Sequence, residues 1–247
     1  MQREKMKINL KNHEVIEDLN LDGLKIIQST KLYRFTSDPV ILANFVKAKK
    51  TDRLLDIGTG SGIIPILVCH KTNLKSAVGV ELQPEMADMA TRSVELNALS
   101  DKITIQNVDI KDFKSVHVFD IVTCNPPYKK SGTCKPNEEK SKAIARHEIT
   151  LNLKEVCTSA KKYLKFGGRF YVCIDASRTA ELLFELKSVG LEPKKMFYSQ
   201  SGKGESPSIL FVEAVNGGKE GIKVLPNVVV NDQDGNYLEN VKKMRFD

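Results

Sequence analysis

The sequence lacks any apolar run that approaches the roughly 18 residues of a membrane span. Its opening stretch, MQREKMKINLKNHEV, holds too many charges for the apolar part of a signal peptide. Internal repeats and low-complexity linkers are also missing from the 247 residues. These absences argue against membrane, secreted and repeat proteins, and we expect a cytoplasmic protein.

Cysteine is scarce, and its spacing excludes two further classes. The five cysteines are odd in number and scattered, and none forms a CxxC pair. This pattern argues against a disulfide framework and against a zinc site. We therefore expect small buried side chains in a reducing compartment, and no bound metal. The cysteines are Cys69, Cys124, Cys134, Cys157 and Cys173.

The composition is that of a globular protein with a basic surplus. Hydrophobic residues make up 41% of the chain and charged residues 28%, which separates it from disordered sequences. The 38 lysines and arginines outnumber the 31 acidic residues and give a net charge of +7. The surplus favours an anionic partner without identifying it, because many proteins that bind no nucleic acid share it.

From about residue 53, short apolar runs alternate with helical patterns. This alternation is typical of βαβ units and predicts an α/β fold around a mainly parallel sheet. The expected strands are 53–58, 76–82, 102–109, 118–125 and 169–175. The expected helices lie around 63–71 and over 84–99, 151–166 and 178–190, and Gly167-Gly168 should end the third of them. Two closing strands, 191–200 and 206–215, are expected to run antiparallel.

Both ends of the chain are expected to be appendages of one domain over residues 51–217. Residues 1–50 should form an extension that packs on this core, with short strands or a hairpin within 19–35 and one helix. Asp38 is expected to cap that helix, with Pro39 at its first position. Residues 218–247 form a polar tail with a strand-like run.

A glycine loop follows the first expected strand. The segment Asp56-Ile-Gly58-Thr-Gly60-Ser-Gly62 joins that strand to a helix. Glycines at such a turn let the backbone turn tightly and let a ligand approach the N–H groups closely. Glu81 ends the second expected strand, where a carboxylate can accept both hydroxyls of a ribose.

A third acid, Asp109, ends the third expected strand, where an acceptor could meet an adenine amino group. Asp56, Glu81 and Asp109 would then lie along the sheet edge at which open α/β folds bind ligands. A single such acid is as well explained by a helix cap or a solvated loop. Three of them at consecutive strand ends, beside a glycine loop, indicate a binding site.

The type of ligand follows from the details of the loop. An NAD-binding Rossmann domain shares the glycines and the second acid, but this loop reads GxGxG instead of GxGxxG. Asp56 would be badly placed beside a pyrophosphate, whereas it suits a positively charged ligand. The pattern D-x-G-x-G-x-G with Glu81 and Asp109 resembles the class I S-adenosylmethionine-dependent methyltransferases over most of residues 50–215.

This resemblance implies a Rossmann-like fold with a mainly parallel seven-stranded sheet, helices on both faces and an antiparallel closing strand. It also implies S-adenosylmethionine as the cofactor and S-adenosylhomocysteine as its product. The cofactor carries a sulfonium and an ammonium but no phosphate, which agrees with the acidic loop. By the same resemblance, Phe35 and Thr36 line the adenosine side of the cofactor.

The motif Asn125-Pro126-Pro127-Tyr128 follows the fourth expected strand. It resembles the motif of amino-group methyltransferases that act on adenine N6, guanine N2 or a glutamine amide. A planar amino group is a poor nucleophile because its lone pair is delocalised. If the Asn125 side chain and the Pro126 carbonyl each accept one N–H, the lone pair can turn toward the methyl group. The prolines hold that carbonyl still, and Tyr128 can stack on a flipped-out base.

Three acceptor molecules fit this motif. Release-factor glutamine methyltransferases typically carry a helical N-terminal domain, and guanine-N2 enzymes of ribosomal RNA often have a larger N-terminal half. Residues 33–45, YRFTSDPVILANF, and residues 145–148, ARHE, look most like the bacterial tRNA adenine-N6 methyltransferases that act on valine tRNA. A non-enzymatic RNA-binding protein with a decayed methyltransferase fold is disfavoured, because the acids and Asn125 are present together.

The segment between the motif and the next helix is rich in lysine and should contact the phosphates of RNA. Lys129, Lys130 and Arg146 are its candidate contacts, and His147 is expected to have a structural or RNA-binding role. His147 is not needed as a base, because water can take the proton from a methylated, cationic amine.

We predict that changing Lys129, Lys130 and Arg146 together to alanine weakens RNA binding. The plot of log affinity against log salt concentration has a negative slope, and each lost phosphate contact should make that slope less steep by about 0.7 to 0.9. Filter binding of RNA at salt concentrations from about 50 to 200 mM measures both the affinity and the slope. Unaltered affinity and slope would show that the segment is only a solvated loop.

Overall fold

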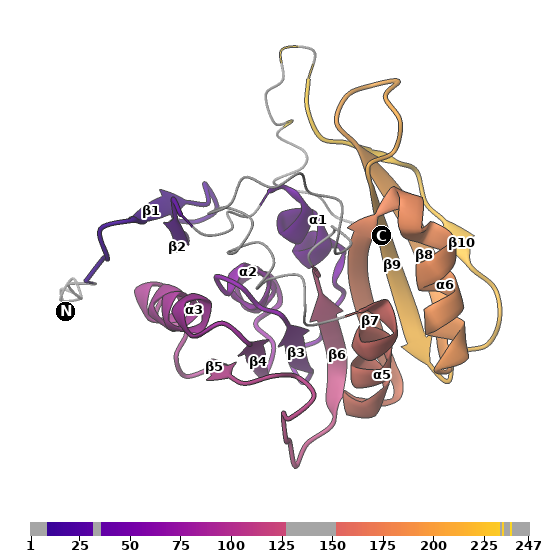
Figure 1. Cartoon of the computed structure of the whole chain (residues 1–247), viewed down its shortest axis with the longest axis horizontal. Helices are drawn as coiled ribbons and strands as arrows, with labels where there is room; N and C mark the ends of the chain where they lie inside the picture. The colour runs from indigo at the N-terminus through magenta and orange to yellow at the C-terminus, as the bar shows by residue number, and fades with distance from the viewer. Residues whose placement is uncertain (1–8, 32–35, 127–151, 233, 235–237, 239–247) are drawn as a thin grey trace, which may run out of the picture.

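The computed structural model describes residues 9–31, 36–126, 152–232, 234 and 238. Its centre is a twisted sheet (Figure 1). The main strands are β3 (Arg53–Ile57), β4 (Ser76–Glu81), β5 (Ile103–Asn107), β6 (Phe119–Cys124), β7 (Leu164–Asp175), β8 (Leu191–Gln200) and β9 (Ile209–Asn216). They lie side by side in the order β5-β4-β3-β6-β7-β9-β8. The first five are parallel and β9 is antiparallel to both of its neighbours, which confirms the expected sheet.

The strand-like run in the tail forms two short strands instead of one. They are β10 (Lys223–Val224) and β11 (Val228–Val229), and both pair in parallel with β8. Pro226 lies between them and has no N–H to offer a continuous ladder. The tail therefore covers the outer edge of β8.

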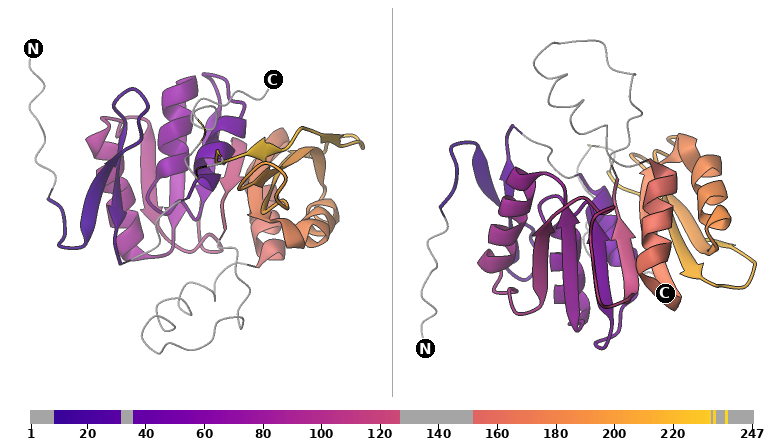
Figure 2. Two further views of the ribbon diagram at one scale, coloured as in Figure 1. Left: turned by 90° about the horizontal axis from the view of Figure 1, so that it is seen from above. Right: turned by 60° about the horizontal axis from the view of Figure 1, so that its bottom comes forward.

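Helices cover both faces of the sheet, as expected. The helices are α1 (Asp38–Phe45), α2 (Ile63–Thr72), α3 (Pro84–Leu96), α5 (Leu153–Tyr163) and α6 (Thr179–Ser188). Side chains alternate between the faces of each strand. Leu54 and Ile121 pack in one buried cluster with α1 and α2, whereas Leu55 and Val122 pack in the other with α5 and α6. Figure 2 shows α5 and α6 side by side on their face of the sheet.

Two expected helix ends were wrong. Ser37, and not Asp38, is the N-cap of α1, and the Asp38 carboxylate instead accepts the Thr36 hydroxyl at 2.8 Å. Helix α5 ends at Tyr163, well before Gly167-Gly168, because Leu164 already has extended backbone and pairs with Phe119. The two glycines lie inside β7, where the pairing with β6 shifts its register.

The N-terminal extension contains a β-hairpin, one of the two expected alternatives. Its strands β1 (Glu14–Asp18) and β2 (Lys25–Ser29) pair in antiparallel fashion. The hairpin begins earlier than the expected range of 19–35. Ile27 packs against Met86 and Met89 of α3, so the hairpin is attached to the core through that helix.

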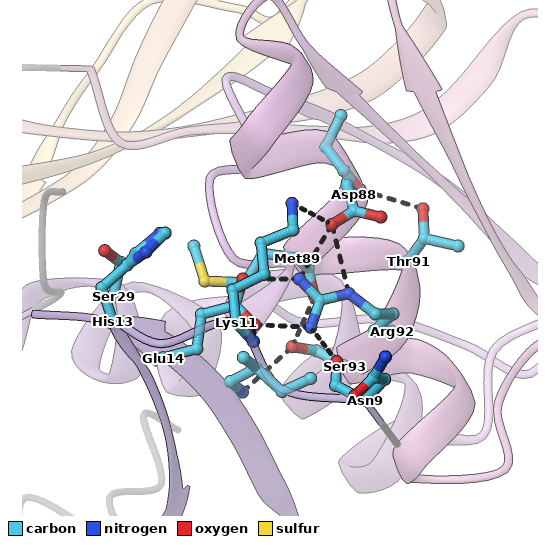
Figure 3. A network of polar contacts seen from close by, with 12 residues as sticks. Asn9, Lys11, His13, Glu14, Ser29, Asp88, Met89, Thr91, Arg92 and Ser93 are labelled. Atoms are coloured by element: carbon cyan, nitrogen blue, oxygen red, sulfur yellow. Dashed lines mark hydrogen bonds and ion pairs between the residues drawn. The ribbon is translucent and has the colours of Figure 1, made fainter. Parts of the chain in front are cut away.

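Ion pairs also attach the hairpin to α3 (Figure 3). The Arg92 guanidinium donates to both carboxylate oxygens of Glu14, at 2.7 and 2.6 Å. It also donates to Asp88, which pairs with Lys11 at 2.9 Å. The Arg92 hydrogen bond holds the pKa of Glu14 below its ordinary value. None of the helices in the described ranges has the length and hydropathy of a membrane-spanning segment.

We predict that Arg92→Ala lowers the free energy of unfolding by about 2–3 kcal/mol, measured by urea unfolding. The Glu14 side chain is only 3% exposed and would lose its charged partner. Arg178→Ala is the matched control, because the paired Glu181 side chain is 38% exposed and can return to water. The control should cost less than about 1 kcal/mol. Equal losses in the two variants would contradict a role of Glu14 burial.

Candidate active site at the carboxyl edge of the sheet

The glycine loop connects β3 to α2 through left-handed backbone. Gly58, Gly60 and Gly62 have φ angles of 68°, 58° and 84°, which only glycine adopts without strain. The N–H groups of Gly58 and Thr59 both donate to the Val80 carbonyl, at 2.9 and 3.0 Å. The loop is therefore attached to β4 as soon as it leaves β3.

Glu81, the last residue of β4, holds the same loop with its side chain. One carboxylate oxygen accepts the Gly60 N–H at 2.9 Å and the other accepts the Gln83 N–H at 3.0 Å. The residue is 6% exposed. Each oxygen has two lone pairs and can still accept a hydroxyl of a ligand. Glu81 thus ends its strand as expected, and its role as a ribose acceptor stays a prediction.

Asp56 is completely buried at the end of β3. Its Oδ1 accepts the Thr123 hydroxyl at 2.6 Å, whereas its Oδ2 has no hydrogen-bond partner among the described residues. Burial raises the pKa of Asp56 to about 7, and the charge of Glu81 adds to the rise. The hydroxyls of Thr123 and Thr59 oppose it, but only the Thr123 hydroxyl has hydrogen-bond geometry.

Asn125 and Pro126 follow β6 directly. Pro126 is buried, and the Asn125 side-chain oxygen accepts the Cys173 thiol of β7, with 3.1 Å between Sγ and Oδ1. Asp56 and Ile57 of β3 pair with Thr123 and Cys124 of β6. The register therefore brings Asn125 to the edge that carries Asp56, Glu81 and the glycine loop.

Asp109 and Thr36 are less closely joined to this group. Asp109 does not end its strand as expected: β5 ends at Asn107, and Asp109 lies two residues beyond it, where its Oδ1 accepts the Lys111 N–H at 2.9 Å. Thr36 donates to Asp38, and no described contact connects it to the glycine loop. The remaining predicted site residues lie outside the described residues: Phe35, Pro127, Tyr128, Lys129, Lys130, Arg146 and His147.

Sequence reasoning missed two side chains of the site, Thr123 and Cys173. Alternation along 118–125 puts Thr123 and Asn125 on one face, which is a usable signal. Alternation does not identify the hydrogen-bond partners of these side chains, because the partners depend on which strands are neighbours in the sheet.

The polar side chains of the site fit a positively charged ligand that also has hydroxyl groups. Two buried carboxylates are present, and no described lysine or arginine pairs with Asp56 or Glu81. A Cβ atom added at Gly58 would meet nothing within 4 Å, so there is open space beside this glycine, whereas one added at Gly60 would lie 3.6 Å from Met86 Cε. S-adenosylmethionine matches this set better than a phosphate-bearing cofactor does. The described residues contain no cluster of metal ligands, and the predicted absence of a metal stays a prediction.

A family model described as the methyltransferase small domain matches residues 36–189. A Dyadobacter fermentans protein named tRNA1(Val) (adenine(37)-N6)-methyltransferase is 30% identical over 148 residues, which cover 59% of this chain. The match spans about three fifths of that relative, 61% of its length. A protein of the same name from Shewanella sediminis is 22% identical over 218 residues, which cover 84% of this chain and 88% of the relative.

Two solved structures share the fold. A predicted O-methyltransferase of Agrobacterium tumefaciens has a TM-score of 0.65 and 17% identity, with 83% of this chain and 95% of that one covered. Geranyl diphosphate C-methyltransferase of Streptomyces coelicolor, in complex with Mg²⁺, geranyl diphosphate and S-adenosyl-L-homocysteine, has a TM-score of 0.52 and 14% identity. That match covers 71% of this chain and 76% of the other. These likenesses confirm the expected Rossmann-like fold.

We predict that Asp56 makes the ligand-free protein less stable as the pH rises from about 4 to 7. In this window the unfolded state ionises Asp56 while the folded state keeps the proton, because the folded pKa is raised to about 7. Over this window the free energy of unfolding of the wild type should fall, relative to that of Asp56→Asn, by on the order of 4 kcal/mol in total. Urea unfolding of both proteins across the window measures it.

Asp120→Asn is the control for this prediction. Burial pushes the pKa of Asp120 up, but hydrogen bonds from Lys165 and the Arg53 N–H lower it overall. The stabilisation that ionised Asp120 contributes to the folded state is complete above its pKa in the unfolded chain. It is lost only as the pH falls through the lowered pKa of the folded state. The Asp120→Asn curve should run parallel to wild type above about pH 5. If the Asp56→Asn curve is also parallel there, Asp56 is not the titrating group.

Proposed function

Because the chain belongs to the methyltransferase small domain family, we propose that it transfers a methyl group from S-adenosylmethionine to N6 of an adenine in tRNA. The family confirms the predicted class, a methyltransferase, and the acceptor is the part that we propose. One observation carries it: Asn125 and Pro126 directly follow β6, at the edge that holds Asp56 and Glu81. The proposed cofactor site, lined by carboxylates, and the proposed acceptor site for an amino group would thus lie next to each other.

The cofactor side would use the acids and the loop. Bound S-adenosylmethionine supplies a methyl group that is activated by the positive charge on its sulfur. Glu81 would accept the ribose hydroxyls while it continues to hold Gly60. Asp56 would face the positively charged methionine part, and Asp109 and Thr36 would contact the adenosine part together with Phe35.

The acceptor side would use Asn125 and Pro126. The Asn125 oxygen and the Pro126 carbonyl would each accept one N–H of the target amino group. The nitrogen lone pair would then point at the methyl carbon, and a new N–C bond would form as the S–C bond breaks. The proton of the cationic product would leave to water. Alignment and fixed acceptors provide the rate gain.

Two features support tRNA adenine over the other amino groups. The relatives described above carry the name tRNA1(Val) (adenine(37)-N6)-methyltransferase. The described part of the N-terminal extension is a β-hairpin followed by α1, which differs from the helical domain expected of a release-factor enzyme. Tyr128, Lys129, Lys130, Arg146 and His147 would contact the RNA. Cytoplasmic location and the division into residues 1–50, 51–217 and 218–247 stay predictions.

The acceptor is tested by incubating the protein with labelled S-adenosylmethionine and, separately, unmodified tRNA, ribosomal RNA, DNA and release factor. The expected product is N6-methyladenosine in valine tRNA, identified by nucleoside digestion and mass spectrometry. Label in guanine N2 or in a glutamine would replace the proposed acceptor. Label in none of the four would contradict the activity itself.

We predict that Asn125→Ala lowers the rate of methyl transfer at least about 100-fold, as loss of a fixed transition-state acceptor typically does. Single-turnover measurements with saturating cofactor isolate this step. Asn9→Ala is the control, because Arg92 contacts only the backbone carbonyl of Asn9, which alanine keeps. Undiminished transfer by Asn125→Ala would refute the mechanism.

A further inference from the structure

The two oxygens of the Asp56 carboxylate have different surroundings. Oδ1 accepts the Thr123 hydroxyl at 2.6 Å, and Oδ2 has no hydrogen-bond partner among the described residues. Asp56 and Thr123 are both 0% exposed. A buried polar atom without a partner is rare and costly, so it calls for an explanation. A ligand group that reaches Oδ2 would provide one.

The position of the Thr123 hydroxyl is fixed by the fold. Thr123 lies opposite Asp56 in the parallel pairing of β6 with β3. Threonine is β-branched, so its side chain has few rotamers on a strand. The hydroxyl therefore holds one oxygen of Asp56 in place, and the planar carboxylate leaves the other oxygen in a defined direction.

We propose that Thr123 is a positioning residue for the methyl donor: its hydroxyl holds Oδ1 of Asp56 so that Oδ2 is presented to the positively charged methionine part of S-adenosylmethionine. This inference rests on the proposed function, because it needs that cofactor. It assigns the role to a residue outside both sequence motifs. Thr123 does not touch the cofactor and acts through Asp56.

The charges around Asp56 agree with this role. Glu81 on β4 adds a negative charge, and Cys124 on β6 stays a neutral thiol because burial raises its pKa. No described lysine or arginine pairs with Asp56. The Thr123 hydrogen bond favours the ionised carboxylate and opposes the effect of burial on its pKa. A cationic ligand would favour the ionised form further, so cofactor binding should release a proton below about pH 7.

The test is calorimetric titration of the full-length protein with S-adenosylmethionine between about pH 5.5 and 8.5, on either side of the raised Asp56 pKa of about 7. Thr123→Val keeps the branched shape and removes the donor, and Thr123→Ser keeps the donor. At pH 7 the Kd should rise about tenfold in Thr123→Val and less than about threefold in Thr123→Ser. The pH below which affinity declines should move upward in Thr123→Val only. A change of packing alone would not move that profile.

Thr72→Val is the matched control, since among the described residues its hydroxyl bonds only to the Val68 carbonyl, in the last turn of α2. It should bind like wild type at every pH. If Thr123→Val does not fold, Thr123→Cys replaces it, with a weak donor and an expected Kd above that of Thr123→Ser.

The outcomes separate the inference from the function on which it rests. If wild type binds S-adenosylmethionine but Thr123→Val binds it within twofold and with the same pH profile, the positioning role is wrong and the proposed function stands. Equal losses in Thr123→Val and Thr123→Ser would also overturn the role. If wild type does not bind the cofactor at all, the proposed function is wrong, and the positioning role that rests on it is wrong as well.

Discussion

Strands β4, β3, β6 and β7 run parallel, and the whole site depends on that constraint. Parallel strands bring their carboxyl ends to one edge, where open α/β folds bind ligands. Here each strand end is also joined to a neighbouring one by a side-chain hydrogen bond. These contacts join Glu81 to Gly60, Thr123 to Asp56 and Cys173 to Asn125. A slip in the register of β3 or of β6 would break two of them and separate the proposed cofactor side from the proposed acceptor side.

The chain treats its buried acids in two ways, and the difference indicates their use. Glu14 is bound by both arms of the Arg92 guanidinium, so its charge is neutralised within the protein. Its contribution is to attach the hairpin to α3. Asp56 is buried as deeply but receives one hydroxyl and no described cation. Such a group lowers stability unless something positive binds to it, which is the arrangement expected of a binding site and not of a structural one.

The sequence predicts those parts of the fold and site whose signals are local. The glycine loop and Glu81 each belong to one strand and the turn after it, so the apolar runs suffice to place them. Thr123 was missed because its partner lies on β3, which pairs with β6 although β4 and β5 intervene in the sequence. The prediction that Gly167-Gly168 ends a helix was wrong for another reason, because a glycine pair fits a helix end and an irregular strand equally well. The pairing of Leu164 with Phe119, which the sequence does not show, identifies this segment as a strand. Ser37 and Asp38 are both good caps, and the contact from Thr36 to Asp38 is not visible in the sequence.

Thr123 near the end of β6 and Asn125, which directly follows that strand, link the proposed donor side to the proposed acceptor side. Thr123 and Asn125 are alternate residues, so continued alternation would direct both side chains to the same face of the sheet. Thr123 bonds to Asp56 of β3 and Asn125 to Cys173 of β7, so the end of β6 is held from both sides just before Pro126. The acid proposed to face the methyl donor and the amide proposed to face the acceptor are therefore both held at the end of β6. Their separation cannot change without breaking the sheet, and a methyl transfer that relies on alignment requires that kind of rigidity.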